Sequence, residues 1–316
     1  MTRRVWIDTD MGFDDLAAIV TVLADSTVEV VGMSLVAGNA SLPVVAANAA
    51  RAAAFLQWRM PIHLGRASPL LGAGVSAGYA LGEGGMRTAG RTLPEAAAAL
   101  SALSAFDAMS AAFAETGEKV EILALGPLTN MAVLLMARPE LRAGIRRIVW
   151  MGGSAGPGNH SAAAEFNAFV DPEAVEIVVA SGVQFLMVGL DCCRQVTVSL
   201  GDAAKLRSIG TETGEVLADL LEGYVRIASA DGSRPMALYD PVAAAALLDP
   251  LAVAFSLGHI DIERGGNAGR GATFVDRRVP HRATANADVA VTADAARVRD
   301  RVLGALAAVA MERDAK

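Results

Sequence analysis

The sequence predicts an α/β fold: a mostly parallel, doubly wound (Rossmann-like) sheet with helices on both faces. Short apolar runs alternate with longer stretches of helical character through the first two thirds of the chain, which is the pattern of such a sheet. No Pro/Ser-rich linker divides the 316 residues, so we expect a single domain, residues 1–316. Parallel sheets bind ligands at the carboxyl ends of their strands, and we expect the active site at that edge. The polar groups that follow expected strand ends are Asp10, Asn39, the Leu125 carbonyl, Asn159 and Asp191.

The individual elements are predicted from apolar runs, turn residues and helix caps. The expected strands are residues 5–7, 28–36, 61–64, 120–125, 147–151, 183–190, 259–263, 272–276 and 288–291. The expected helices are residues 16–23, 42–56, 93–115, a stretch ending near 139, one that begins at Asp171-Pro172, then 201–208, 214–230, 242–248 and 294 to about 313. The Gly- and Ala-rich stretch 65–90 is expected to be a long loop with partial helix, of which residues 82–86 could cover a site.

The composition favours a small-molecule partner in the cytoplasm. The formal net charge is −7, whereas nucleic-acid binders usually present a basic face, so no nucleic-acid partner is expected. No membrane partner is expected either, because the most apolar stretch, residues 177–190, is shorter than the ~20 residues that span a bilayer. No apolar segment of signal-peptide length follows Arg3 and Arg4. The two cysteines, Cys192 and Cys193, are adjacent, which suits neither a disulfide framework nor a metal site.

Four carboxylates, Asp8, Asp10, Asp14 and Asp15, crowd the loop between the first expected strand and helix, where Gly12 permits a tight turn. Two such charges ~4 Å apart repel by roughly 4 kcal/mol at an effective dielectric of about 20, so the cluster needs protons, hydrogen bonds or a cation. Hard divalent ions, Ca²⁺ or Mg²⁺, are the usual solution. Capping of the helix by Asp14 would explain one or two of the four without any metal. The sequence therefore predicts a metal or catalytic site on this loop.

The stretch Asp8-Thr9-Asp10-Met11-Gly12-Phe13-Asp14-Asp15 closely resembles the signature of the inosine-uridine nucleoside hydrolase family. This family cleaves the N-glycosidic bond of ribonucleosides with a bound Ca²⁺, and its usual Pro after the second Asp is Met11 here. Further segments match in the expected order, among them Glu165-Phe166-Asn167 after a Gly-rich loop and Asp240-Pro241 before a helix. The resemblance covers most of the chain and implies a calcium-dependent ribonucleoside hydrolase that releases free base and ribose.

The resemblance also implies roles for single residues. Asp10 would be the general base that activates a metal-bound water, and Asp8 would support the site. The Ca²⁺ ligands would be Asp10, Asp15, Asp240 and the backbone carbonyl of Leu125; Asp14, Asn39 and Asn167 would bind ribose hydroxyls, Asn159 and Glu165 the 5′ hydroxyl, and Met151 would pack on the sugar. Family members are commonly dimers or tetramers, so a homodimer or homotetramer is expected.

Several of these residues have a simpler interpretation when each is taken alone. Asp240 is then a helix N-cap, Asn39 a turn residue and Met151 a core side chain. Their occurrence in the family order, together with the acidic loop, favours the functional interpretation.

The chain departs from the family pattern where the leaving base is protonated. Many members have a His directly before the metal-binding Asp-Pro, and that position is Tyr239 here; a second family His is replaced by Leu81. Tyrosine has a pKa near 10 and fits the optimum for a general acid less well than His, although a helix N-terminus would lower that pKa somewhat. His160, beside Asn159, is the candidate replacement.

Two other interpretations stay open. A Mg²⁺-dependent phosphohydrolase of the haloacid dehalogenase type would use Asp8 and Asp10, but Gly12 stands where that pattern expects Thr or Val, and Asp14 and Asp15 would have no role. A catalytically weak homologue would bind ribose or nucleoside and Ca²⁺ with little turnover because it lacks both histidines. The intact Asp10 argues against it, since a binding protein does not need the base.

Overall fold

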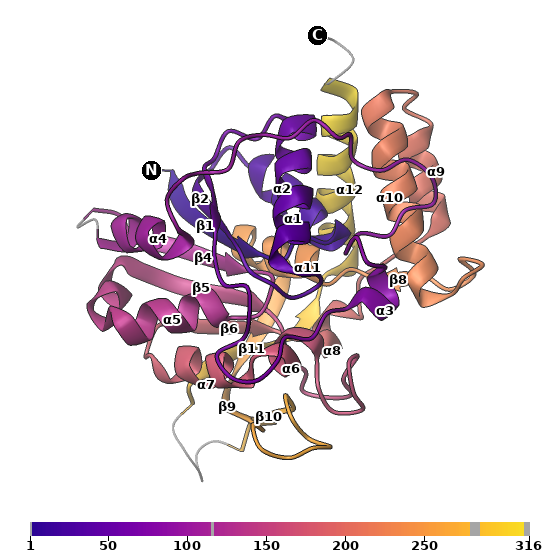
Figure 1. Ribbon diagram of the computed structural model, residues 1–316. Coiled ribbons are helices and arrows are strands. Elements are labelled where there is room, and N and C mark those ends of the chain that lie inside the picture. The colour runs from indigo at the N-terminus through magenta and orange to yellow at the C-terminus, as the bar shows by residue number, and fades with distance from the viewer. Residues whose placement is uncertain (1, 115–116, 279–284, 313–316) are drawn as a thin grey trace.

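The protein is built on a central sheet of nine described strands, as Figure 1 shows in a computed structural model that describes residues 2–114, 117–278 and 285–312. The strands lie in the order β10-β9-β11-β6-β5-β4-β1-β2-β3. Neighbours from β3 to β11 are parallel, and β9 and β10 extend the sheet antiparallel. The strands are β1 (Arg3–Thr9), β2 (Val28–Leu35), β3 (Ile62–Leu64), β4 (Val120–Ala124), β5 (Ile145–Met151), β6 (Phe185–Val188), β9 (Val253–Ile262), β10 (Thr273–Asp276) and β11 (Ala287–Ala293). The expected mostly parallel α/β sheet is thus confirmed.

The strand order reverses direction beside β1. From β1 the chain moves outward through β2 and β3, and it then returns to place β4, β5 and β6 on the other side of β1. Ile7 of β1 is therefore flanked by Met33 of β2 and Leu123 of β4. Loops diverge at such a switch point and leave a crevice beyond the carboxyl ends of the strands, where ligands of open α/β sheets bind.

Helices cover both faces of the sheet, so its strands feed two cores. Val5 and Ile7 point to the face covered by α1, α2, α10, α11 and α12, whereas Trp6 points to the face covered by α4, α5 and α7. The helices are α1 (Phe13–Leu23), α2 (Leu42–Leu56), α3 (Gly78–Leu81), α4 (Ala105–Ala114), α5 (Thr129–Ala137), α6 (Phe166–Val170), α7 (Pro172–Ala180), α8 (Leu190–Cys193), α9 (Leu200–Arg207), α10 (Glu212–Ala228), α11 (Asp240–Leu248) and α12 (Ala295–Glu312), with a 3₁₀ turn at Pro139–Gly144 and a two-stranded ribbon of β7 (Thr197–Val198) and β8 (Met236–Ala237). None of the described helices has the length and apolar character needed to cross a membrane.

The helix expected over residues 93–115 is wrong for residues 93–104, which are not helical; Ala105–Ala114 is helical, and residue 115 lies outside the described residues. The Ala-rich segment before Ala105 is irregular and makes hydrogen bonds to other parts of the chain. The Ala98 amide donates to the Ala50 carbonyl (2.9 Å) and the Ser101 amide to the Ile62 carbonyl (2.8 Å). Tertiary contacts thus override the helical propensity of alanine, which is a weak preference.

A buried ion-pair network links β1, β4 and β5 near their amino ends. The predicted site lies at the other end of these strands. Arg3 donates to both carboxylate oxygens of Glu121 (2.7 and 2.9 Å), and Arg147 donates to one of them (2.6 Å). Both guanidinium groups also donate to the Leu247 carbonyl near the end of α11 (2.7 and 3.0 Å). Burial alone would raise the pKa of Glu121, but the hydrogen bonds and charges of the two arginines outweigh it and hold that pKa below the usual value.

We predict that Glu121→Gln lowers the free energy of unfolding by roughly 3 kcal/mol, because removing one partner leaves charges without compensation in a buried setting. Denaturant unfolding at pH 7 measures this. The exposed pair Arg138–Glu140 supplies the matched control: Glu140→Gln should leave stability nearly unchanged, because solvent screens an exposed ion pair. Equal effects of the two variants would contradict the structural role of Glu121.

Candidate active site

A cavity of about 470 Å³ lies beyond the carboxyl ends of the central strands, at the switch point. Its floor includes Asp10 after β1, Asn39 after β2, Leu125 after β4 and Met151 at the end of β5. Segments from α3, α6, α10 and α11 form its walls; Figure 1 shows α3 and β8 close together beside α10. The cavity also includes Asp14, Asn159, Glu165, Asn167, Tyr239 and Asp240. The edge expected from the sequence therefore carries the cavity.

Three carboxylates from two helices come together beside this cavity; Asp14 and Asp240 line it, and the fully buried Asp15 does not. One oxygen each of Asp14, Asp15 and Asp240 lie within 4.8 Å of one another, and Asp15 and Asp240 are within hydrogen-bond distance. Asp15 and Asp240 are buried, and Asp14 is partly exposed. Such a group of hard oxygen donors could hold a metal ion. It differs from the expected ligand set in that Asp14 belongs to it, while Asp10 faces the same cavity from the end of β1.

Asp10 is held rigidly by the residues that follow β2. The backbone amide of Asn39 donates to one oxygen of Asp10 (2.7 Å), and the Asn39 side-chain amide donates to the other (3.0 Å). Gly38 makes this approach feasible, because a β-carbon there would lie 2.1 Å from Asp10 Oδ2. Asn39 is thus at the cavity, as expected, and its side chain orients the Asp10 carboxylate.

The turn of the acidic loop is not made by the glycine. Gly12 has φ −84°, an ordinary value, whereas Met11 has φ +55°, in the left-handed region that costs a side chain roughly 1 kcal/mol or more. Met11 adopts this conformation because its side chain is fully buried and because the next amide, that of Gly12, donates to Asp15 Oδ2 (2.7 Å). The Thr9 hydroxyl makes a second, short hydrogen bond to Asp15. The loop therefore presents Asp15 with its hydrogen bonds already made.

Asn167 links the ends of two strands beneath the cavity. Its side-chain amide donates to the carbonyls of Leu125 (2.9 Å) and Met151 (3.0 Å), so both of its N–H groups are used. The Leu125 carbonyl keeps a second lone pair, which leaves it able to accept another partner. What Asn167 can offer a ligand is its side-chain oxygen.

Glu165 and Asn159 are held by backbone amides of the α6 region. Glu165 caps α6 and accepts from the amides of Gly153, Asn167 and Ala168, each at 2.9 Å. The side-chain oxygen of Asn159 accepts from the Phe166 amide (2.9 Å). Both side chains still line the cavity. Their orientations are therefore fixed by the protein before any ligand binds.

Burial and mutual repulsion favour the neutral forms of the carboxylates. Burial, together with the charge of Asp15, raises the pKa of Asp14 to about 7, and burial raises the pKa of Glu165 to about 7. The pKa values of Asp10 and Asp240 are raised by burial and by Asp15 as well. A bound cation would offset both the burial of the charged carboxylates and their mutual repulsion. The donor set therefore fits a divalent metal.

Asp8 lies below this layer and is fully buried. Its Oδ1 accepts from Asn130 Nδ2 (2.7 Å) and from the Ser34 hydroxyl, while Oδ2 has no hydrogen-bond partner among the described residues. Burial raises the pKa of Asp8 to about 7. The Asp8 backbone carbonyl also accepts from the Leu125 amide (2.8 Å), which places Leu125 next to Asp10.

The candidate proton donors differ in position. Tyr239 lines the cavity. Burial raises the pKa of Tyr239 to about 12, although the charge of Arg194 opposes this shift. The expectation that the helix N-terminus lowers the pKa of Tyr239 is therefore wrong. His160 is not among the residues that line the cavity. Its ring packs on Phe169, with centroids 4.0 Å apart. Leu81 lines the cavity, so an apolar side chain occupies the position of the second family His.

Sequence reasoning missed several cavity residues: Ala77, Tyr79 and Ala80 at α3, Arg87 in the loop after it, Tyr224 and Ile227 on α10, and Met236 in β8. The Tyr224 hydroxyl donates to the Ala237 carbonyl (2.7 Å) and lies 3.3 Å from Asp14 Oδ2. The helical spacing of Tyr224 and Ile227 placed them on one face of α10, but nothing in the sequence indicated that this face borders the cavity. Asp191, which also follows a strand, is outside the cavity, where it accepts from the Ala155 amide (3.0 Å).

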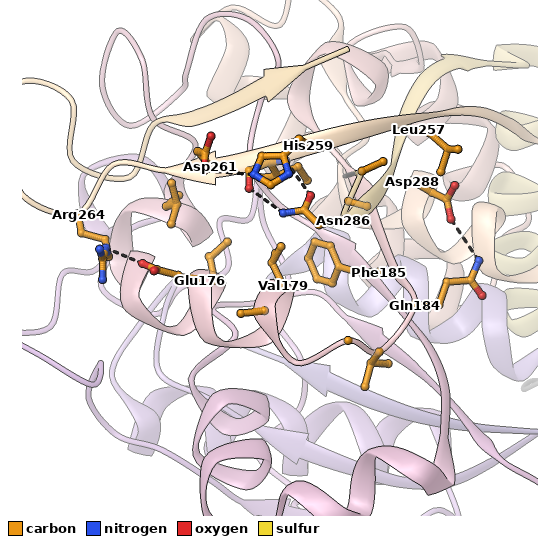
Figure 2. A pocket seen from close by; sticks show the side chains of 18 residues that line it. Glu176, Val179, Gln184, Phe185, Leu257, His259, Asp261, Arg264, Asn286 and Asp288 are labelled. Carbon is orange, nitrogen blue, oxygen red and sulfur yellow. Dashed lines mark hydrogen bonds and ion pairs between the residues drawn. The ribbon is translucent and has the colours of Figure 1, made fainter. Parts of the chain in front are cut away.

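A second cleft, of about 730 Å³, lies between α7 and β9 near the start of β6 (Figure 2). It is larger than the cavity but lies at the amino end of β6, where parallel sheets do not bind ligands. Its polar side chains pair with each other: Arg264 with Glu176 (2.6 Å), and Gln184 with Asp288 (3.1 Å). Because these polar side chains already pair with one another, this cleft does not have the chemistry of an active site.

Comparison with known proteins agrees with the geometry. Residues 5–300 match the sequence model of the inosine-uridine preferring nucleoside hydrolases. The chain is 35% identical over 279 residues to the pyrimidine-specific ribonucleoside hydrolase RihA of Escherichia coli, covering 87% of this chain and 89% of the relative. Among solved structures, a purine-preferring ribonucleoside hydrolase from Gardnerella vaginalis superposes with a TM-score of 0.89 at 25% identity, and a plant nucleoside hydrolase with 0.88 at 27%; each alignment covers 98% of this chain and 100% of the other. A phosphohydrolase of the haloacid dehalogenase type gains no support.

We predict that the metal-free protein becomes less stable as the pH rises from 5 to 8. The folded-state pKa values of Asp8, Asp14 and Glu165 are raised to about 7 from the ordinary values of 3.8 for Asp and 4.5 for Glu, so the folded state holds more protons than the unfolded chain in this window. At pH 8, a divalent cation at a hundredfold excess over its Kd should stabilise the protein by about 2.7 kcal/mol. The same concentration should stabilise it less at pH 5, where protons compete for the carboxylates. Thermal unfolding with chelator and with added Ca²⁺ measures both effects. An equal Ca²⁺ effect at the two pH values would contradict a site built from these carboxylates.

Proposed function

Because the chain belongs to the inosine-uridine preferring nucleoside hydrolase family, whose members hydrolyse N-glycosyl bonds of ribonucleosides, we propose that it does so with Ca²⁺ and with Asp10 as the general base. One observation carries the proposal. The carboxylates of Asp10, Asp14 and Asp240 and a set of amide side chains from separate parts of the chain face one cavity at the switch point of the sheet. Asp15 does not line the cavity but completes the carboxylate cluster with Asp14 and Asp240. That arrangement supplies both a base for water and oxygen donors for a cation.

Ca²⁺ fits this donor set better than Mg²⁺. Every donor is an oxygen, and the donors come from loop and helix termini in an irregular arrangement, which Ca²⁺ tolerates with its six to eight ligands. Asp10, Asp15, Asp240 and the Leu125 carbonyl would hold the ion, and Asp14 is near enough to contribute. When bound, Ca²⁺ would lower the pKa of a coordinated water and fix ribose hydroxyls.

The protein's own residues prepare the sugar for attack. Asp10 takes a proton from the attacking water as the water oxygen bonds to C1′, and Asn39 keeps its carboxylate in position for this step. The oxygens of Asp14 and Asn167 bind ribose hydroxyls, Asn159 and Glu165 bind the 5′ hydroxyl, and Met151 packs on the sugar. Positive charge develops on the ribosyl group as the bond breaks, and the surrounding carboxylates stabilise it.

Tyr239 is the proposed hydrogen-bond donor to the leaving base. With a pKa of about 12 it stays protonated at every practical assay pH, so it donates a hydrogen bond but is a weak acid. His160 does not line the cavity; its ring packs against Tyr79 and Phe166, which do, so it is not placed to take this role directly. The relatives are named for different bases, pyrimidines in one case and purines in another, so their names do not select the base for this chain.

We predict that Asp10→Asn lowers ribose release from the best ribonucleoside at least 10³-fold, because the water loses its base. The assay compares purine and pyrimidine ribonucleosides with Ca²⁺ and with chelator. Asp191→Asn is the matched control: it also follows a strand at this edge but is outside the cavity, so it should retain activity. Binding of nucleoside without ribose release by the unaltered protein would favour the catalytically weak binding homologue instead.

We predict that Tyr239→Phe lowers kcat on ribonucleosides about tenfold, the worth of one hydrogen bond formed to the departing base. Its effect on 4-nitrophenyl riboside should be smaller, since nitrophenolate departs without such help. Steady-state kinetics on both substrates measure the difference. An equal loss on both would exclude Tyr239 as the donor to the base.

A further inference from the structure

We propose that Arg87 recognises the leaving base and stabilises its negative charge, and that this selects bases with a carbonyl oxygen next to the glycosidic nitrogen, the oxopyrimidines such as uracil. The inference rests on the proposed function and extends it to the base. It begins from the charges around the cavity. Among the described residues that line it, Arg87 is the one Lys, Arg or His, and the other ionisable side chains are carboxylates and tyrosines.

The guanidinium of Arg87 is free to meet a ligand. Within the described parts of the chain it makes no ion pair and no hydrogen bond, whereas its neighbour Arg91 pairs with Glu215 and Asp219. A cation beside a cluster of carboxylates would ordinarily pair with one of them if it could reach. Arg87 lines the cavity without doing so, so it is available to substrate.

The backbone that carries Arg87 is anchored on both sides. Before it, the Gly84 carbonyl accepts from Asn48 Nδ2 (2.8 Å). After it, the Ala89 amide donates to the Asp219 carbonyl (2.9 Å) and the Arg91 amide to the Asp219 carboxylate (2.8 Å). Arg87 itself is exposed, but its anchored backbone fixes where the side chain begins, so less freedom is lost on binding a ligand than from a loose loop.

The anchoring places Arg87 on the α10 wall of the cavity. Its backbone carbonyl packs against Gly223, where an added β-carbon would lie 2.5 Å away, and Ile227 lines the cavity one helical turn further along. The groups proposed to hold the ribose come instead from the end of β5, the start of α1, the loop before α6 and α6 itself. With the sugar held there, the base must occupy the rest of the cavity, beside Arg87, Leu81 and Tyr239.

The chemistry of the departing base explains what a guanidinium can do there. When the C1′–N bond breaks, its electron pair goes to the base, and in an oxopyrimidine the negative charge spreads onto the carbonyl oxygens. A guanidinium keeps its protons at any assay pH, so it does not protonate the base; it donates hydrogen bonds to those oxygens. The water gives its proton to Asp10, and the base anion takes a proton from solvent after it departs. Adenine has no carbonyl oxygen and gains less from this contact.

The test compares uridine, adenosine and 4-nitrophenyl riboside, whose leaving group departs without help from the protein. For Arg87→Gln we expect the ratio of kcat/KM for uridine to that for 4-nitrophenyl riboside to fall about 30-fold, mainly through kcat. The corresponding ratio for adenosine should change less than threefold, and Arg87→Lys should recover part of the loss on uridine. Arg91→Gln is the matched control, because this arginine is on the same loop but pairs away from the cavity; it should leave the uridine ratio unchanged.

The outcomes separate this inference from the function on which it rests. Equal losses of Arg87→Gln on all three substrates, no loss on uridine, or the same change of ratio in Arg91→Gln would overturn the role of Arg87 while leaving the hydrolase function intact. A preference of the unaltered protein for adenosine over uridine would overturn it as well. No turnover of 4-nitrophenyl riboside or of any nucleoside by the unaltered protein would overturn the proposed function, and this inference with it.

Discussion

The mutual repulsion of carboxylates gathered in one buried place is the constraint on which the rest of the site depends. Asp15 from the start of α1 and Asp240 from the start of α11 approach to hydrogen-bond distance, and the two helices pack side by side. Helix N-termini carry partial positive charge, which offsets part of the repulsion. The Thr9 hydroxyl and the Gly12 amide offset more of it at Asp15. The repulsion that remains favours binding of protons or of a cation. The folded protein thereby acquires affinity for a metal ion.

Buried carboxylates have opposite roles at the two ends of the strands: a structural role at the amino ends and a chemical role at the carboxyl ends. At the amino edge Glu121 is as buried as the site carboxylates, yet Arg3 and Arg147 lower its pKa and make it a structural ion pair. At the carboxyl edge Asp10 and Asp240 have no arginine partner within the described structure, and their pKa values are raised. A fully paired charge stabilises the fold but cannot react. The incomplete pairing at the carboxyl edge is thus what leaves those groups able to bind and to accept protons.

The sequence predicted the sheet and the residues of its carboxyl edge because both depend on local patterns. Apolar runs mark strands, and Asp10, Asn39 and Leu125 follow directly from where those runs end. Features that depend on tertiary contact were not predictable. Whether the Met11 or the Gly12 backbone turns is decided by burial of the Met11 side chain, and the irregular course before α4 is set by hydrogen bonds to Ala50 and Ile62.

On the leaving-group side of the cavity, too, the decisive contacts were not predictable from local sequence patterns. This side also explains how the protein can do without the two family histidines, which are replaced by Tyr239 and Leu81. Leu81 and the raised pKa of Tyr239 make this wall poor in acids, so a base that must be protonated before it departs would leave slowly. A base that departs as an anion needs no acid; it needs a fixed positive charge near the atoms that become negative. Arg87 supplies that charge from a loop whose place on α10 no local pattern revealed. Exchanging an acid for a permanent cation therefore narrows the range of bases while the sugar chemistry at Asp10 stays unchanged.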